Sequence, residues 1–136
     1  MGIVRAAVAV SLVLSAGACG KRQGQDNSDP AVTEFHDRYD REQYQLIWNG
    51  SYRDFQRAVS ASEFAAKMGK IHSKLGDVES ANQVASQNLE VFDKTYKIVT
   101  SETDFESGKF TETFKFIKVN NQFVLFNYDI QPSPLD

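Results

Sequence analysis

Apolar residues recur at helical spacing through the first half of the chain. Two such runs contain Val32, Phe35, Tyr39 and Leu46, and then Phe64, Met68, Ile71 and Leu75. An interruption is expected at Asn49-Gly50, because both residues favour the left-handed conformation that ends helices. Ser60 and Glu63 have the spacing of a capping box, which marks a new helix start. A short helical piece through Tyr52, Phe55 and Val59 lies between the two runs, so the pattern predicts three helical pieces over about 32–76.

The spacing of apolar residues changes after residue 76. Segments near 78–88, 91–103, 109–119 and 122–130 are rich in Val, Phe, Thr, Tyr and Ile, which is typical of strands. Helices followed by consecutive hairpins predict an α+β domain, in which the helices pack on one face of a four-stranded antiparallel sheet.

The last hairpin also has a predicted register. A two-residue Asn120-Asn121 turn fits type I′, because both central positions need positive φ. That turn pairs the strand residues in a fixed order: Val119 with Gln122, Ile117 with Val124, Phe116 with Leu125 and Glu112 with Asp129. Glu112 and Asp129 are then expected to face each other.

Charge and composition exclude several classes of partner. Arg5 is one of 15 Lys+Arg residues, and all 18 Asp+Glu lie beyond residue 18, so the rest of the chain has a net charge of −4. Its cations are scattered singly, which leaves no basic patch for nucleic acid and no polybasic segment for anionic lipid. We expect a single domain over 32–131, followed by a short tail at 132–136.

The N-terminus has the pattern of an export signal. One cation precedes an apolar run from Ala6 to Leu14, and small residues then lead into Cys19. The run is shorter than the ~20 residues of a membrane-spanning helix, so residues 1–18 are predicted to be a signal peptide. The stretch resembles the lipobox of bacterial lipoproteins, which implies that Cys19 is lipidated. An ordinary secreted protein is the alternative, because Ala16-Gly17-Ala18 also satisfies the A-x-A rule.

Cysteine usage favours the lipid-anchored alternative. Cys19 is the single cysteine of the chain, so it can form no internal disulfide in an oxidising compartment. Gly20 follows it where lipoprotein sorting would use Asp for inner-membrane retention. The resemblance therefore implies a bacterial envelope location, at the outer membrane facing the periplasm if the cell is Gram-negative. Residues 19–31 lack aromatic and branched aliphatic side chains and are expected to be a disordered tether.

Short motifs carry a further resemblance. They are Trp48-Asn49-Gly50-Ser51-Tyr52, the segment 75–80, Glu112-Thr113-Phe114 and the segment 120–130. Together they resemble a family of small bacterial exported proteins of unknown function. That family is similar in plan to the curved, cone-shaped cystatin-like fold of nuclear transport factor two and ketosteroid isomerase. The resemblance implies no catalytic residue and no cofactor.

The sequence offers little catalytic chemistry. His36 and His72 lie in charged helical segments and are both expected to be solvent-exposed, and no metal-binding motif is present. The Glu112/Asp129 pair has two interpretations. An enzyme could use it as acid and base, whereas neighbouring lysines could simply relieve its charge repulsion at a solvated sheet edge.

Two sets of residues are candidates for binding. Amphipathic side chains that could line a cleft between helix and sheet are Tyr39, Gln43, Trp48, Tyr52, Tyr96 and Tyr128. Residues expected on a sheet face without helices, where they could form an interface, are Phe114, Phe116, Phe123 and Leu125. Phe126 is expected on the opposite, helix-facing side. A second copy of the chain or an envelope protein would be the partner.

Two functions follow as hypotheses. In the first, the protein is a membrane-anchored envelope lipoprotein that acts as a non-catalytic binding or interaction module. In the second, it is a small hydrolase-like or isomerase-like enzyme that uses a cavity of the cone. The absence of an acid–base motif and the long tether favour the first.

Overall fold

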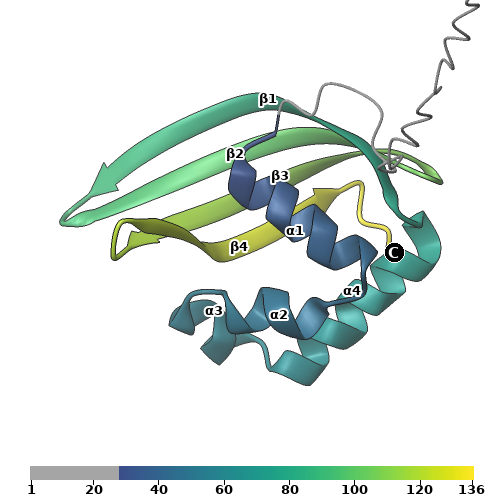
Figure 1. Ribbon diagram of the computed structural model, residues 1–136, viewed down its shortest axis with the longest axis horizontal. Coiled ribbons are helices and arrows are strands. Elements are labelled where there is room, and N and C mark those ends of the chain that lie inside the picture. Colours follow the sequence, from purple (N-terminus) through teal and green to yellow (C-terminus); the bar gives the residue numbers. More distant parts are fainter. Residues whose placement is uncertain (1–27) are drawn as a thin grey trace, which may run out of the picture.

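The computed structural model describes residues 28–136, and its helices precede its strands (Figure 1). The elements are α1 (Pro30–Asp40), α2 (Tyr44–Asn49), α3 (Arg53–Ala58), α4 (Ala61–Leu75), β1 (Val78–Val91), β2 (Lys94–Phe105), β3 (Gly108–Val119) and β4 (Gln122–Gln131). The strands form one antiparallel sheet in the order β1-β2-β3-β4. The predicted α+β architecture is confirmed. The predicted signal peptide and Cys19 lie outside the described residues.

Capping residues set the ends of the helices. The Asp29 carboxylate accepts a hydrogen bond from Ala31 N at 2.9 Å, and Pro30 occupies the first turn of α1, where its missing N–H costs nothing. Ser60 and Glu63 form the predicted capping box of α4. Asp29 also binds Lys97 Nζ at 2.6 Å. The folded part therefore begins before residue 32, and the last residues of the expected tether belong to it.

The predicted register of the β3–β4 hairpin holds close to its turn. Asn120 and Asn121 both have positive φ, at 48° and 65°, as a type I′ turn requires. The predicted pairs Val119–Gln122, Ile117–Val124 and Phe116–Leu125 are all present.

Beyond Phe116 a β-bulge changes the register. Lys115 pairs with Asn127, so Phe126 is the extra residue of β4. Glu112 consequently pairs with Ile130, and Asp129 pairs with Thr113. The prediction that Glu112 faces Asp129 is wrong, because one extra residue moves Asp129 to the other side of the sheet.

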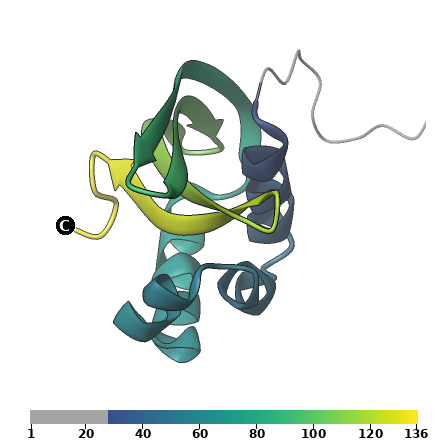
Figure 2. The same ribbon diagram turned by 90° about the vertical axis from the view of Figure 1, so that its left-hand side faces the viewer.

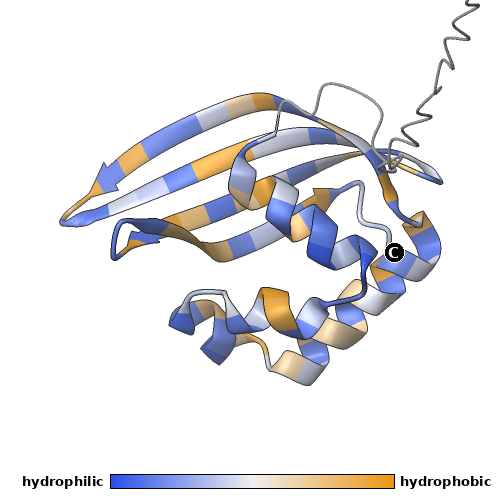
Figure 3. Cartoon of the chain, viewed as in Figure 1, coloured by the Kyte–Doolittle hydropathy of each residue, from blue (hydrophilic) through white to orange (hydrophobic). Residues whose placement is uncertain are grey.

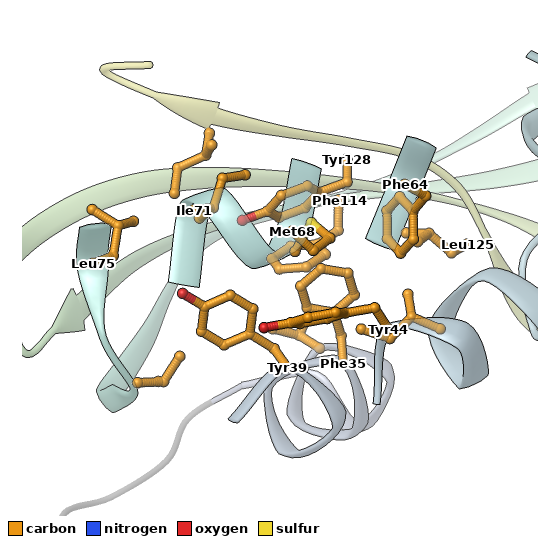
Figure 4. Packing of buried hydrophobic residues seen from close by; sticks show 14 of the residues in the cluster. Phe35, Tyr39, Tyr44, Phe64, Met68, Ile71, Leu75, Phe114, Leu125 and Tyr128 are labelled. Atoms are coloured by element: carbon orange, nitrogen blue, oxygen red, sulfur yellow. The ribbon is translucent and has the colours of Figure 1, made fainter. Parts of the chain in front are cut away.

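The hydrophobic core lies between the helices and one face of a strongly curved sheet. Helix α1 lies across the sheet, while α2, α3 and α4 lie beyond the edge formed by β4 (Figures 1 and 2). Hydrophobic and hydrophilic residues alternate along the strands, as expected for a sheet with one face in the core (Figure 3). Figure 4 shows Phe35, Met68, Phe114 and Tyr128 gathered at the centre of this core.

The candidate interface residues lie in this core rather than on a free face. Phe114, Phe116 and Leu125 are buried on the helix-facing side, and Phe123 packs against the same cluster. The expectation that they are exposed opposite the helices is therefore wrong. Both faces of this hairpin carry large apolar side chains, so the sequence pattern alone could not say which one the helices cover.

A small aromatic cluster covers the opposite face of the sheet. Ile117 pairs with Tyr96, and the Tyr96 ring lies 5.7 Å from the ring of Phe126. Phe126 in turn contacts Tyr52, at a ring distance of 6.0 Å. Ile117 is only 2% exposed although it is not a member of the hydrophobic cluster between the helices and the sheet. The placement of Phe126 on the helix-facing side is thus also wrong.

In the described part of the chain, no helix is long and apolar enough to cross a membrane.

Candidate functional site

A cluster of polar side chains lies inside the hydrophobic core. Its centre is the fully buried carboxylate of Glu112 on β3. Three side chains donate hydrogen bonds to this carboxylate: His36 Nε2 at 2.7 Å, Thr103 Oγ1 at 2.5 Å and Tyr128 OH at 2.6 Å. Since the donors come from α1, β2 and β4, the cluster joins the first helix to three strands of the sheet.

Local sequence explains why these side chains converge. Glu112 and Phe114 are two residues apart in β3, so their side chains point to the same, helix-facing side of the sheet. The bulge at Phe126 turns Tyr128 to that side as well. In α1, His36 follows Val32 by four residues and precedes Tyr39 by three, so it lies on the apolar stripe of the helix. The prediction that His36 is exposed is wrong, and this spacing is the signal that could have corrected it.

The charges in the cluster are strongly coupled. Burial alone would raise the pKa of Glu112, but the positive charge of His36 and the three hydrogen bonds outweigh it and hold the pKa below its usual value. Burial, together with the negative charge of Glu112, raises the pKa of Tyr128 well above its usual value. Glu112 is therefore an ionised acceptor and Tyr128 a protonated donor over the ordinary pH range. A carboxylate held in this way is a weak base.

A groove beside the cluster is open to solvent. It runs between α4 and β4, and it consists of two adjoining cavities of about 210 and 200 Å³, the first also walled by α3 and the second by residues 133–135. Both are lined by Lys67 and Tyr128. The first cavity is otherwise mostly apolar, with Phe55, Val59 and Met68 among its walls. We call this feature the β4–α4 groove, and Tyr128 connects it to Glu112.

The side chains predicted to share a pocket are dispersed. Tyr39 is buried, and its hydroxyl donates to the Gly76 carbonyl at 3.0 Å. Gln43 is exposed just before α2. Trp48 Nε1 donates to the Val59 carbonyl at 2.9 Å.

The remaining predicted pocket residues lie on both sides of the sheet. Tyr52 and Tyr96 contact Phe126 on the face opposite the helical core. Tyr128 is the member of the set that lines the β4–α4 groove. The structure therefore does not assemble the predicted pocket, because its residues sit on different faces of the helices and the sheet.

A second polar cluster surrounds His72 near the end of α4. His72 Nδ1 lies 2.9 Å from the Tyr44 hydroxyl, and Nε2 lies 2.7 Å from Asp77 Oδ1. The His72 side chain is only 13% exposed, so its predicted solvent exposure is also wrong. Burial and the nearby charge of Glu42 raise the pKa of Tyr44 to about 12, which keeps its hydroxyl protonated.

Comparison with protein families assigns the chain to one of them. The model of the DUF4019 family, described as proteins of unknown function, matches residues 31–128. This match covers most of the described residues, from α1 to the tyrosine that binds Glu112. The chain belongs to the DUF4019 family. The description of the family names no activity and no site residues that could be transferred to this chain.

Other comparisons add little to the family assignment. A crystal structure of a DUF4783 family protein from Bacteroides ovatus, at 1.40 Å resolution, is similar to the chain with 18% sequence identity and a TM-score of 0.47. The similarity covers 79% of this chain and 96% of that one. No curated protein matches the chain.

Proposed function

We propose that the protein is a lipid-anchored module of the bacterial envelope that binds an extended segment of a partner protein in the β4–α4 groove, without catalysis. The observation that carries this proposal is the pair of adjoining cavities that share Lys67 and Tyr128. The dimer interface expected from the sequence gives no support to a second copy as partner, because Phe114, Phe116 and Leu125 are in the core.

The division of the groove into two cavities and its position favour a peptide over a metabolite. Each cavity alone, at about 210 or 200 Å³, is smaller than the about 300–1,000 Å³ of a usual small-molecule site, although the two together fall within that range. Each is therefore suited to a single side chain. They follow one another along β4, which is an edge strand with backbone groups that an extended peptide can pair with. Tyr52 N already donates to the Leu125 carbonyl, which limits the available edge at that end.

Charge indicates the chemistry of the peptide. Lys67 is an exposed residue of α4 at the junction of the two cavities. An acidic residue between two apolar ones would place its carboxylate beside this ammonium group while its neighbours fill the cavities. The expected ligand is thus an extended apolar–acidic–apolar segment.

The alternative function, a cavity-based enzyme, is less well supported by the fold and by the buried carboxylate. We infer that the domain is a variant of the cone-shaped fold that nuclear transport factor two shares with ketosteroid isomerase, and its curved sheet agrees with this. That cone hosts enzymes as well as binding modules, so the fold does not decide the function. Glu112 is the buried carboxylate that could serve as a general base in such an enzyme. Its three hydrogen-bond donors and its lowered pKa make it a weak base.

Selection from a random peptide library displayed on phage tests the groove. We expect enrichment of peptides with an acidic residue between apolar ones, and Lys67→Glu should weaken their binding by about tenfold or more, since it places like charges together. Lys70→Glu is the matched control, because Lys70 is an exposed lysine on the same helix that does not line the groove. Failure to enrich such peptides, or equal loss in both variants, would contradict the proposal.

The lipid anchor has its own test. The apolar run that leads into Cys19 supports acylation, and two or more acyl chains hold a protein stably on a membrane. We expect the full-length wild type to partition into the detergent phase after fractionation of expressing cells. Cys19→Ala should instead be recovered as a soluble protein or an unprocessed precursor. Equal aqueous recovery of both proteins, after identical processing, would exclude the anchor.

A further inference from the structure

Three side chains that commonly bind metals meet at the end of α4. Asp40 is the last residue of α1, His72 lies in the last turn of α4, and Asp77 directly precedes β1. One ligand atom from each residue lies within 4.8 Å of the other two. The fold thus brings together residues that are separated by up to 37 positions in the sequence, which explains why no sequence motif indicated the site.

Neighbouring groups orient these side chains. Val78 N donates to Asp40 Oδ1 at 2.9 Å, and this fixes the carboxylate at the end of α1. His72 directs Nε2 toward Asp77 Oδ1 at 2.7 Å, while Nδ1 contacts the Tyr44 hydroxyl at 2.9 Å. A histidine that binds a metal through one nitrogen typically donates a hydrogen bond from the other. Tyr44 is in position to accept that bond.

We propose that Asp40, His72 and Asp77 form a binding site for Zn²⁺. An imidazole nitrogen favours zinc over magnesium or calcium, which prefer all-oxygen ligands. The two carboxylates balance the charge of the ion. The side chains of His72 and Asp77 are 13% and 25% exposed, so water can complete a four-coordinate shell.

The site requires only a small adjustment to hold the ion. Ligands at about 2.0–2.1 Å from a tetrahedral zinc lie about 3.3 Å from one another. The ligand atoms here lie within 4.8 Å of one another, and His72 Nε2 lies 2.7 Å from Asp77 Oδ1, so binding would draw Asp40 inward and move His72 and Asp77 slightly apart. The bound ion would take the place of the direct contact between His72 and Asp77, and it would tie the ends of α1 and α4 to the start of β1.

Calorimetric titration with zinc chloride tests the proposal. The full-length chain carries Cys19→Ser in every variant, because a free thiol also binds zinc. We expect one saturable site per chain. Asp40→Asn and Asp77→Asn should each weaken it by about tenfold or more, and both keep a side-chain oxygen that can accept the existing hydrogen bond. Asp93→Asn, in the exposed turn between β1 and β2, is the control and should leave the affinity unchanged.

A second measurement separates zinc binding from a folding defect. Zinc should raise the melting temperature of the parent protein and of Asp93→Asn, because an ion that binds only the folded state stabilises it. It should raise that of Asp77→Asn far less. The proposal is overturned if zinc shows no saturable binding to the parent, or if Asp77→Asn binds and is stabilised as well as the control.

Discussion

Replacing Phe114 by alanine is expected to lower the free energy of unfolding by about 3–5 kcal/mol, the range for removing a buried phenylalanine. Phe114 is 0% exposed, and its ring lies 5.1 Å from that of Phe35 and 5.2 Å from that of Tyr128. It therefore links α1 to β4 through the centre of the core, and the cavity left by its removal cannot collapse easily. Urea denaturation of the full-length protein measures the loss.

Phe126→Ala is the matched control on the other face of the sheet. Phe126 is only partly buried and packs against the rings of Tyr52 and Tyr96, so we expect a loss of roughly 1–2 kcal/mol. A larger loss for Phe126→Ala than for Phe114→Ala would mean that the helices cover the face assigned here to the aromatic cluster.

Glu112→Ala is expected to cost about 3–5 kcal/mol, because removing one member of a buried charged network leaves its partners uncompensated. His36, Thr103 and Tyr128 would each lose the acceptor of a short hydrogen bond at a carboxylate that is fully buried. His36 Nδ1 is already buried without a hydrogen-bond partner, so the variant would leave both nitrogens of this ring unpaired. The same denaturation experiment measures this loss.

The pH dependence of stability tests whether Glu112 is ionised in the folded protein. Because the pKa of Glu112 is lower in the folded state than in the unfolded state, its contribution is present above the unfolded pKa and is lost as the pH falls through the folded one. Glu112→Gln cannot ionise, so its stability should fall less between pH 7 and acidic conditions than that of the wild type. Equal acid sensitivity of the two proteins would contradict the charged state assigned to this carboxylate.

The sequence predicted most of the fold because local signals were strong. The Ser60–Glu63 capping box and the Asn120-Asn121 turn each specify a structure within a few residues. The bulge at Phe126 has no comparable signal in the sequence. It moves every side chain that follows it in β4 to the face of the sheet opposite to the one predicted. The turn alone therefore predicts Asp129 beside Glu112, although Asp129 lies on the other side of the sheet.

The candidate site was less predictable than the fold. Charged neighbours in the sequence predict solvent exposure for His36 and His72, although tertiary contacts bury His36 completely and leave only 13% of the His72 side chain exposed. Glu112 became part of a buried network only because α1 crosses the sheet above it, and a sequence pattern does not specify that crossing. The groove depends in the same way on how α4 lies beside β4.

A crystal structure of the protein with one selected peptide tests the central claim most directly. We expect an extended peptide between β4 and α4, with two apolar side chains in the adjoining cavities and a carboxylate beside Lys67. A peptide bound instead on the aromatic cluster around Phe126, with the groove left open, would contradict peptide binding in the β4–α4 groove.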